Sequence, residues 1–110
     1  MICIPITVEI VNAFYSIVKS KSTYLGFWVH NENLCIYAEL NEVYYLNLCS
    51  AKGVPDLSMR LPVEAMRTVM NLGHLEIETI PHADNTTSEK ISSYDMNNRL
   101  ICNVEIASEY

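Results

Sequence analysis

The stretch TYLGFWVHNENLCIYAELNEVYYLNLC, from Thr23 to Cys49, predicts three strands of one small sheet. The strands run over Thr23 to His30, Leu34 to Leu40 and Val43 to Cys49. The segments between them are short and polar, which is typical of hairpin turns. The sequence therefore predicts an antiparallel meander at the centre of the fold.

Both faces of this predicted sheet carry apolar side chains. One alternating set comprises Leu25, Phe27, Val29, Leu34, Ile36, Ala38, Leu46 and Leu48, and the other comprises Trp28, His30, Cys35, Tyr37, Tyr45 and Cys49. An antiparallel sheet with one wet face should be polar on that face, so we expect the second set to be covered. The cover is either another part of this chain or another protein. Because Trp and Tyr are enriched at interface centres, the predicted interface residues are Trp28, His30, Cys35, Tyr37 and Tyr45.

A third use of the same aromatic residues is the stacking of nucleobases by Trp28, Tyr37 and Tyr45. Sheets that bind nucleic acid in this way normally carry Arg and Lys nearby. Here the neighbouring charges are those of Glu32, Glu39 and Glu42, so the sequence favours this use least.

Two helices flank the meander in the sequence. Apolar residues recur at helical spacing between Thr7 and Ser20, with Thr7 as the expected N-cap. A second helix is expected to begin at Pro62 and to end before Gly73, with an apolar stripe of Val63, Met66, Val69 and Met70. Met1 to Val8 is expected to form an opening strand, and Ala51 to Ser58 a loop.

The C-terminal part of the chain predicts further strands. Leu75 to Ile80 alternates apolar residues with Glu76 and Glu78, and Pro81 follows it. The polar stretch from His82 to Glu89 is expected to be a mobile loop. Lys90 to Tyr94 and Arg99 to Ala107 are expected to form a hairpin around Met96-Asn97-Asn98.

Together these segments predict a single α+β domain over residues 1–110, a mainly antiparallel sheet with two helices on one face. No internal repeat is evident in the sequence. Half of the residues are apolar and 18% are charged, which excludes a disordered chain, and no apolar run is long enough to span a membrane. The net charge of −6 disfavours direct binding of nucleic acid by a monomer.

The cysteines and the N-terminus favour a cytoplasmic location, the host cytoplasm if the protein is viral. Cys3, Cys35, Cys49 and Cys102 match no metal-ribbon, finger or redox spacing, so reduced core or sheet residues are expected. Met1 to Val8 lacks the basic lead-in of a signal peptide.

No catalytic, cofactor or metal motif accompanies these features. His30, His74 and His82 each have nearby acids but no second His or Cys at ligand spacing, and Gly26, Gly53 and Gly73 are too dispersed for a phosphate loop. Glu76 and Glu78 share one side of a strand, which is more typical of a solvated face than of an acid and base pair. We therefore expect no enzyme activity and no cofactor.

The order of predicted elements resembles one structural module of the DNA polymerase processivity clamps. The similar stretches are the helix Val8 to Ser20, the hairpin LGFWV (25–29) to LCIY (34–37), and LPVEAM (61–66), within about two-thirds of the chain. The resemblance implies modules that close a ring, sheets that join edge to edge outside, and helices that line the DNA passage. Lys19, Lys21 and Arg67 would then face DNA.

The chain departs from that family in its charges. Glu9 and Glu64 lie on the same helices as the lining cations, and no partner pocket can be carried over residue by residue. The first hypothesis is accordingly a non-catalytic module that binds a protein partner, of the kind viruses and mobile elements use to inhibit or redirect a host complex. The alternative is a clamp-like replication accessory that forms a homo-oligomer around DNA.

Overall fold

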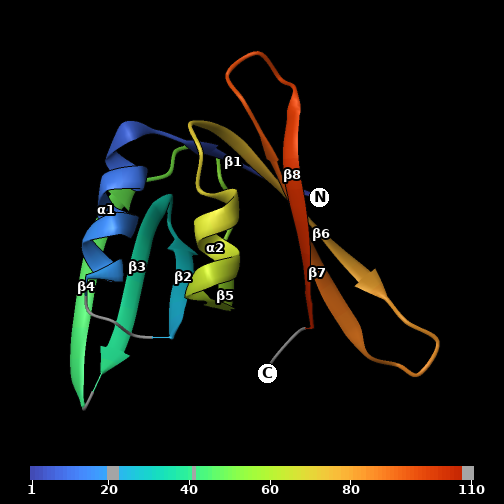
Figure 1. Cartoon of the computed structure of the whole chain (residues 1–110), viewed down its shortest axis with the longest axis horizontal. Coiled ribbons are helices and arrows are strands. Elements are labelled where there is room, and N and C mark those ends of the chain that lie inside the picture. The colour runs from blue at the N-terminus through green and yellow to red at the C-terminus, as the bar shows by residue number, and fades with distance from the viewer. Residues whose placement is uncertain (20–22, 41, 108–110) are drawn as a thin grey trace.

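The computed structural model describes residues 1–19, 23–40 and 42–107 and shows an α+β fold (Figure 1). Its elements are β1 (Ile2–Ile6), α1 (Val8–Val18), β2 (Tyr24–His30), β3 (Asn33–Leu40), β4 (Val43–Ser50), β5 (Leu57–Pro62), α2 (Val63–Val69), β6 (Gly73–Pro81), β7 (Thr87–Tyr94) and β8 (Leu100–Ala107). The predicted fold class is confirmed. The opening strand, the meander and the C-terminal hairpin are also confirmed, within a few residues at their ends.

The strands form two antiparallel sheets where the sequence predicted one. The first sheet has the order β4-β3-β2-β5 and the second the order β1-β6-β7-β8. The expected loop from Ala51 to Ser58 ends earlier, because β5 begins at Leu57 and pairs with β2. Its alternation of Leu57, Met59 and Leu61 with polar residues is short, and the sequence reading missed it.

The topology is a duplication that the sequence does not reveal. Each half of the chain contributes one strand, one helix and three strands, β1-α1-β2-β3-β4 and then β5-α2-β6-β7-β8. The first strand of each half lies in the sheet of the other half, since β1 pairs with β6 and β5 pairs with β2. Two similar halves thus exchange their first strands.

Helix α1 begins where the sequence predicted it. Thr7 is extended, and its Oγ1 accepts a hydrogen bond from the Ile10 backbone N–H at 3.3 Å, which satisfies one free amide of the first turn. Ile10, Phe14 and Ile17 recur on one face and are buried. The predicted C-terminal residue Ser20 lies outside the described residues.

Helix α2 is shorter than expected because it ends at Val69. Pro62 precedes its first turn, and the predicted apolar stripe is buried. Gly73 does not cap the helix but begins β6 at a φ of 136°. A Cβ at this position would collide with the backbone of Tyr94 and Asp95, so only glycine fits.

The loop predicted from His82 to Glu89 is shorter than expected. Strand β7 begins at Thr87, and the His82 N–H donates to the Thr86 carbonyl at 2.9 Å, which closes a tight turn. The turn between β7 and β8 lies where the sequence placed it, with Asn98 at a left-handed φ of 61°. Asn tolerates that conformation better than most residues.

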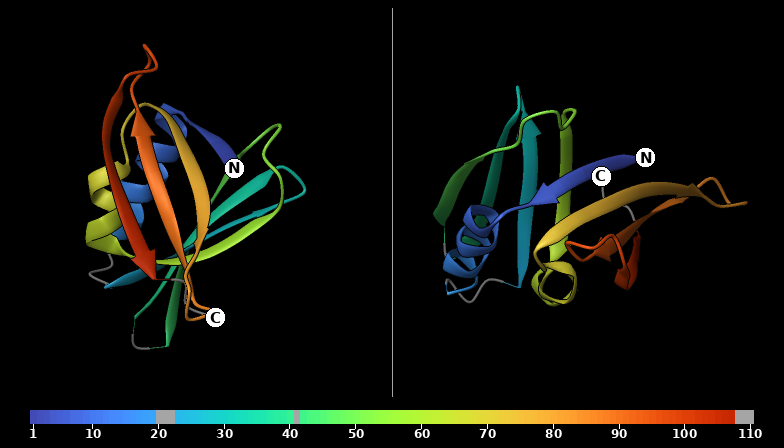
Figure 2. Two further views of the ribbon diagram at one scale, coloured as in Figure 1. Left: turned by 90° about the vertical axis from the view of Figure 1, so that its right-hand side faces the viewer. Right: turned by 90° about the horizontal axis from the view of Figure 1, so that it is seen from above.

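Both helices lie on the same side of the molecule (Figure 2). Helix α1 contacts β3 and β4 of the first sheet, whereas α2 contacts β5 and also β7 and β8 of the second sheet. One continuous core joins the two sheets and includes Phe14, Phe27, Ile36 and Leu75. The sequence predicted two helices on one face of a single sheet. In the structure the two helices lie on one side of the molecule, but α1 packs on the first sheet and α2 packs on strands of both sheets.

Candidate protein-interaction face

One face of the β4-β3-β2-β5 sheet points toward the helices and the other points away from them. Phe27, Val29, Leu34 and Ile36 are fully buried on the helix side. The pairings Trp28↔Cys35, Cys35↔Leu48, Tyr37↔Leu46 and Trp28↔Ser58 place these residues together on the opposite side. We call that surface, formed by Trp28, Cys35, Tyr37, Leu46, Leu48 and Ser58, the outer face.

The outer face is apolar and open to solvent. Trp28 is 47% exposed, Leu46 61% and Leu48 74%, although all three are large apolar side chains. They line a shallow hollow in which Cys35 is buried and Tyr37 is half-buried. The exposure of Trp28, Leu46 and Leu48 removes the explanation that another part of the described chain covers them.

Four residues of β4, Tyr45, Leu46, Leu48 and Cys49, lie on the opposite face from the one that the sequence predicted. Tyr45 pairs with Ala38, Asn47 with Ile36 and Cys49 with Leu34, so these three residues of β4 lie on the helix side. The reason is the two-residue loop between Leu40 and Val43, because partners across such a turn have opposite parity. Leu46 and Leu48 were expected in the core and instead lie beside Trp28 and Tyr37.

The helix side of β4 is closed by polar contacts with α1. The Asn47 side-chain amide donates to the Ala13 carbonyl at 3.1 Å, and the Cys49 thiol lies 3.9 Å from the Glu9 carbonyl. Burial, assisted by the negative charge of Glu9, raises the pKa of Cys49. These contacts explain how α1 can cover a strand whose inward residues are not all aliphatic.

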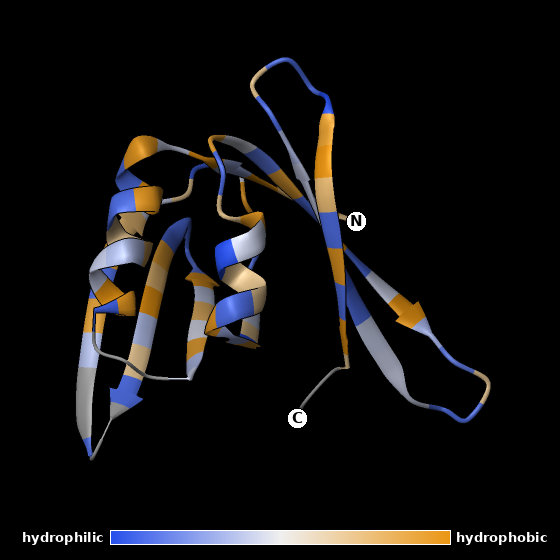
Figure 3. Ribbon diagram, viewed as in Figure 1, coloured by the Kyte–Doolittle hydropathy of each residue, from blue (hydrophilic) through white to orange (hydrophobic). Residues whose placement is uncertain are grey.

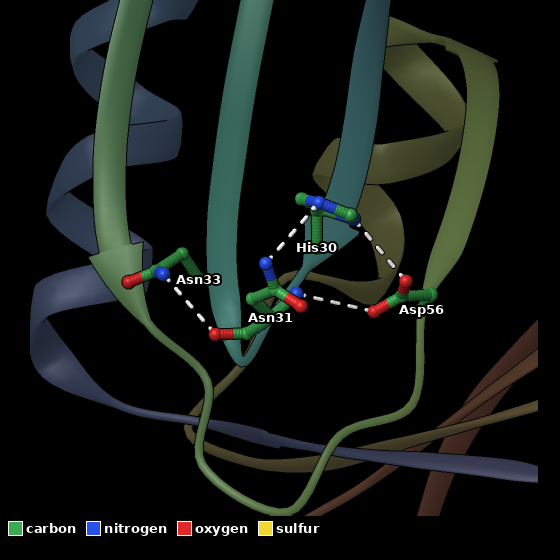
Figure 4. A network of polar contacts seen from close by, with 4 residues as sticks. All are labelled: His30, Asn31, Asn33 and Asp56. Atoms are coloured by element: carbon green, nitrogen blue, oxygen red, sulfur yellow. Dashed lines mark hydrogen bonds and ion pairs between the residues drawn. The ribbon is translucent and has the colours of Figure 1, made fainter.

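At one end of the outer face a polar network fixes His30 (Figure 4). The His30 ring stacks on Trp28, with centroids 5.7 Å apart, and its Nδ1 lies 3.2 Å from an Asp56 carboxylate oxygen. The other Asp56 oxygen accepts from the Asn31 backbone N–H at 3.1 Å. Asp56, which the sequence did not single out, thus ties the β2–β3 turn to the loop before β5.

At the other end, Tyr37 lies against a glycine. Gly26 is its cross-strand partner, and a Cβ at position 26 would overlap the Tyr37 ring. The Arg60 guanidinium lies 5.2 Å from the centroid of the Tyr24 ring, in a cation–π arrangement.

The structure therefore brings Trp28, His30, Cys35 and Tyr37 together as predicted, without Tyr45, and adds Leu46, Leu48 and Arg60. The three aromatics proposed for base stacking do not share a face.

The corresponding face of the second sheet is polar. Cross-strand partners Glu76, Ser92 and Asn103, and then Glu78, Lys90 and Glu105, follow one another across β6, β7 and β8. The alternation of hydrophobic and hydrophilic positions is visible along β8 (Figure 3). A hydrogen bond to the Glu76 carboxylate raises the pKa of Tyr94, whose ring stacks on His74 at 4.8 Å. Glu76 thus has a structural partner in Tyr94.

A Ser, His and Glu cluster on β7, β8 and the adjoining turn does not have the geometry of a nucleophilic triad. The Ser88 hydroxyl donates to Glu105 at 2.6 Å, and the same His82 nitrogen, Nε2, lies 2.9 Å from Ser88 and 3.7 Å from Glu105. A triad needs the acid on the far nitrogen and the free base on the serine. Here the Ser88 hydroxyl donates its hydrogen bond to Glu105, so His82 is not placed as the base for Ser88.

Among residues 1–19, 23–40 and 42–107, no group of three or more His, Cys, Asp or Glu side chains could hold a metal ion. Within the same residues, neither helix has the length and apolar character needed to cross a membrane. Cys3 is exposed, while burial raises the pKa of Cys35.

The cations that the clamp resemblance assigns to DNA are sparse on the described helices. Lys19 follows α1 and is exposed, and Arg67 on α2 lies 3.5 Å from Glu64. Lys21 lies outside the described residues. Comparison with family models, with curated proteins and with solved structures finds no match in any of the three.

Proposed function

We propose that this chain is a non-catalytic module that binds a partner protein through its outer face. The observation that carries the proposal is the exposure of Trp28 on an interior strand, in the middle of a face whose neighbours Leu46 and Leu48 are still more exposed. Single exposed apolar residues are ordinary on protein surfaces, but a contiguous group with a tryptophan is typical of interaction sites.

The His30 network supports the same proposal. Stacking on His30 and the contact of His30 with Asp56 restrict the Trp28 ring before any partner arrives. A side chain that is already ordered loses less conformational entropy on binding, which increases affinity. The polar residues at both ends of the face, Asp56 and Arg60, would form the rim that such interfaces usually have.

The test is capture of a partner by matched variants. Wild-type protein, Trp28→Ala, Leu48→Ala and Ser92→Ala would be immobilised and exposed to lysate, with Ser92 as the control on the polar face of the second sheet. The proposal expects a protein retained by the wild type and by Ser92→Ala but lost with Trp28→Ala and Leu48→Ala. Equal retention by all four, or equal loss with Ser92→Ala, would contradict it.

A second candidate is a clamp-like accessory that assembles around DNA, and the topology favours it. The order strand, helix, strands, helix, strands is the one on which the resemblance rests, and both helices lie on one side. The charges oppose it, since Glu9 and Glu64 balance Lys19 and Arg67 on the described helices. Light scattering with and without DNA, at low and moderate salt, decides: a ring-sized, DNA-dependent assembly supports this candidate, and indifference to DNA removes it.

A further inference from the structure

The four edge strands of the two sheets differ in how they are protected. An edge strand presents unpaired backbone groups, and proteins discourage edge pairing with short strands, prolines, charges or bulges. Strand β1 has five residues and contains Pro5, and β5 contains Arg60 and Pro62. Strand β8 contains Glu105, and its ladder with β7 has a register irregularity beside Ser93 and Tyr94 of β7.

Strand β4 has none of these protections. Its eight residues, VYYLNLCS, include no charge, proline or glycine, and its ladder with β3 runs without a register shift from Leu40↔Val43 to Asn33↔Ser50. It also carries the two most exposed aliphatic side chains of the outer face, Leu46 and Leu48. A long, regularly paired and uncharged edge of this kind is a template for another strand.

We infer that β4 pairs with β4 of a second copy of this chain, antiparallel and around a two-fold axis, to give one continuous eight-stranded sheet. An axis perpendicular to the sheet keeps the helices of both copies on one side and must pass through a residue that faces itself. With the axis at Asn47, Leu46 of each copy lies opposite Leu48 of the other. Cross-strand apolar pairs of this type stabilise antiparallel sheets.

Charge complementarity selects this second copy and this register. The chain carries a net charge of −6, so two copies repel each other over most of their surface. The uncharged β4 places no like charges opposite one another. With the axis at Asn47, the turn that contains exposed Glu42 at one end of β4 comes close to the turn that contains exposed Lys52 beyond the other end, once at each end of the interface. Moving the axis to Leu46 would place Glu42 opposite Ser50 and lose both pairs.

This inference concerns the edge of the sheet and is independent of the proposed partner on its outer face. It also differs from a ring, because a two-fold pair joins the same edge of both copies and closes at two subunits, whereas a ring joins two different edges. In the dimer the two outer faces lie side by side, so a partner protein would meet a doubled surface.

Sedimentation velocity over a concentration series tests the inference. The wild type is expected to shift from 12.5 kDa toward twice that mass as concentration rises. Glu42→Lys and Lys52→Glu should each raise the dimer Kd about tenfold, and the double variant should return it to within about threefold of wild type, since opposite charges again face each other. Leu48→Lys should abolish the dimer, while the β8 control Asn103→Lys should leave it intact. Circular dichroism would verify that each variant is folded.

The inference would be overturned by a monomer at every concentration, by an assembly larger than two, or by a double charge variant that is no better than either single one. Trp28→Ala separates the inference from the proposed function, because it should remove partner capture without changing the dimer Kd. A dimer lost with Trp28→Ala but insensitive to the charges at Glu42 and Lys52 would indicate face-to-face packing and would also overturn edge pairing.

Discussion

The two sheets have the same topology, but one has a polar outer surface and the other an apolar one. Each has four antiparallel strands, contains one strand lent by the other half of the chain, and packs against a helix. On the β1-β6-β7-β8 sheet the side away from the core carries Glu76, Glu78 and Lys90, as a solvated face should. On the β4-β3-β2-β5 sheet the same side carries Trp28, Leu46 and Leu48. Because the second sheet folds with a polar outer surface, the fold does not require an apolar one.

The comparison supports our proposal that the first sheet carries the interaction surface. Apolar residues on the helix side of both sheets are explained by the core they form, but Trp28, Leu46 and Leu48 on the outer face belong to no buried cluster of the described chain. The two helices also differ, since the side chain of Thr7 caps α1 whereas no side chain caps α2. The two halves are thus similar in topology and different in detail.

The largest expected difference lies between two neighbours on β2, Phe27 and Trp28. Phe27 is fully buried on the helix side, so Phe27→Ala should lower the free energy of unfolding by about 3 to 5 kcal/mol. Trp28→Ala removes a half-exposed ring and should cost about 1 kcal/mol or less. Urea denaturation of both variants checks this. A Trp28→Ala variant as unstable as Phe27→Ala would mean that the outer face is core.

An effect of intermediate size is expected when the thiol reactivities of the two sheets are compared. Cys3, on the second sheet, is exposed, whereas Cys35 is buried on the outer face with a raised pKa. A raised pKa leaves less thiolate at a given pH, so iodoacetamide at pH 8 should modify Cys3 about tenfold faster or more. The Cys35 rate should keep rising at pH values where that of an ordinary thiol has levelled off. Mass spectrometry of the alkylated peptides measures both rates, and equal rates would contradict the assigned burial.

The smallest effect distinguishes the inner side of β4 from the outer side of β8. Asn47→Ala removes the hydrogen bond to the Ala13 carbonyl and should cost about 1 kcal/mol of unfolding free energy. Asn103→Ala, an exposed change on the polar face, should stay within about 0.5 kcal/mol of wild type. If the two variants melt alike, Asn47 does not face α1 and the register of β4 is different.

Local signals sufficed for much of the fold. Thr7 before an apolar repeat located α1, Pro62 located the start of α2, and Asn97-Asn98 located the last hairpin. The candidate site was predicted in part, because the short turn at Asn31 and Glu32 pairs Trp28 with Cys35 and so puts Trp28, His30, Cys35 and Tyr37 on one face. Tyr45 was misplaced because its face depends on the length of the turn before β4, and Asp56 and Arg60 were missed because their partners are distant in sequence.

The sequence by itself determined the α+β class, the two helices and the excess of apolar residues in the meander, because each depends on periodicity and capping over a few residues. Only the tertiary structure decided that the strands form two sheets, that each half lends a strand to the other, and that Leu46 and Leu48 face solvent beside Trp28. Those features are set by pairings between residues far apart in the chain, where β1 meets β6 and β2 meets β5. An alternating hydrophobic pattern indicates that a strand has two different faces, but the pairing with neighbouring strands decides which face is covered.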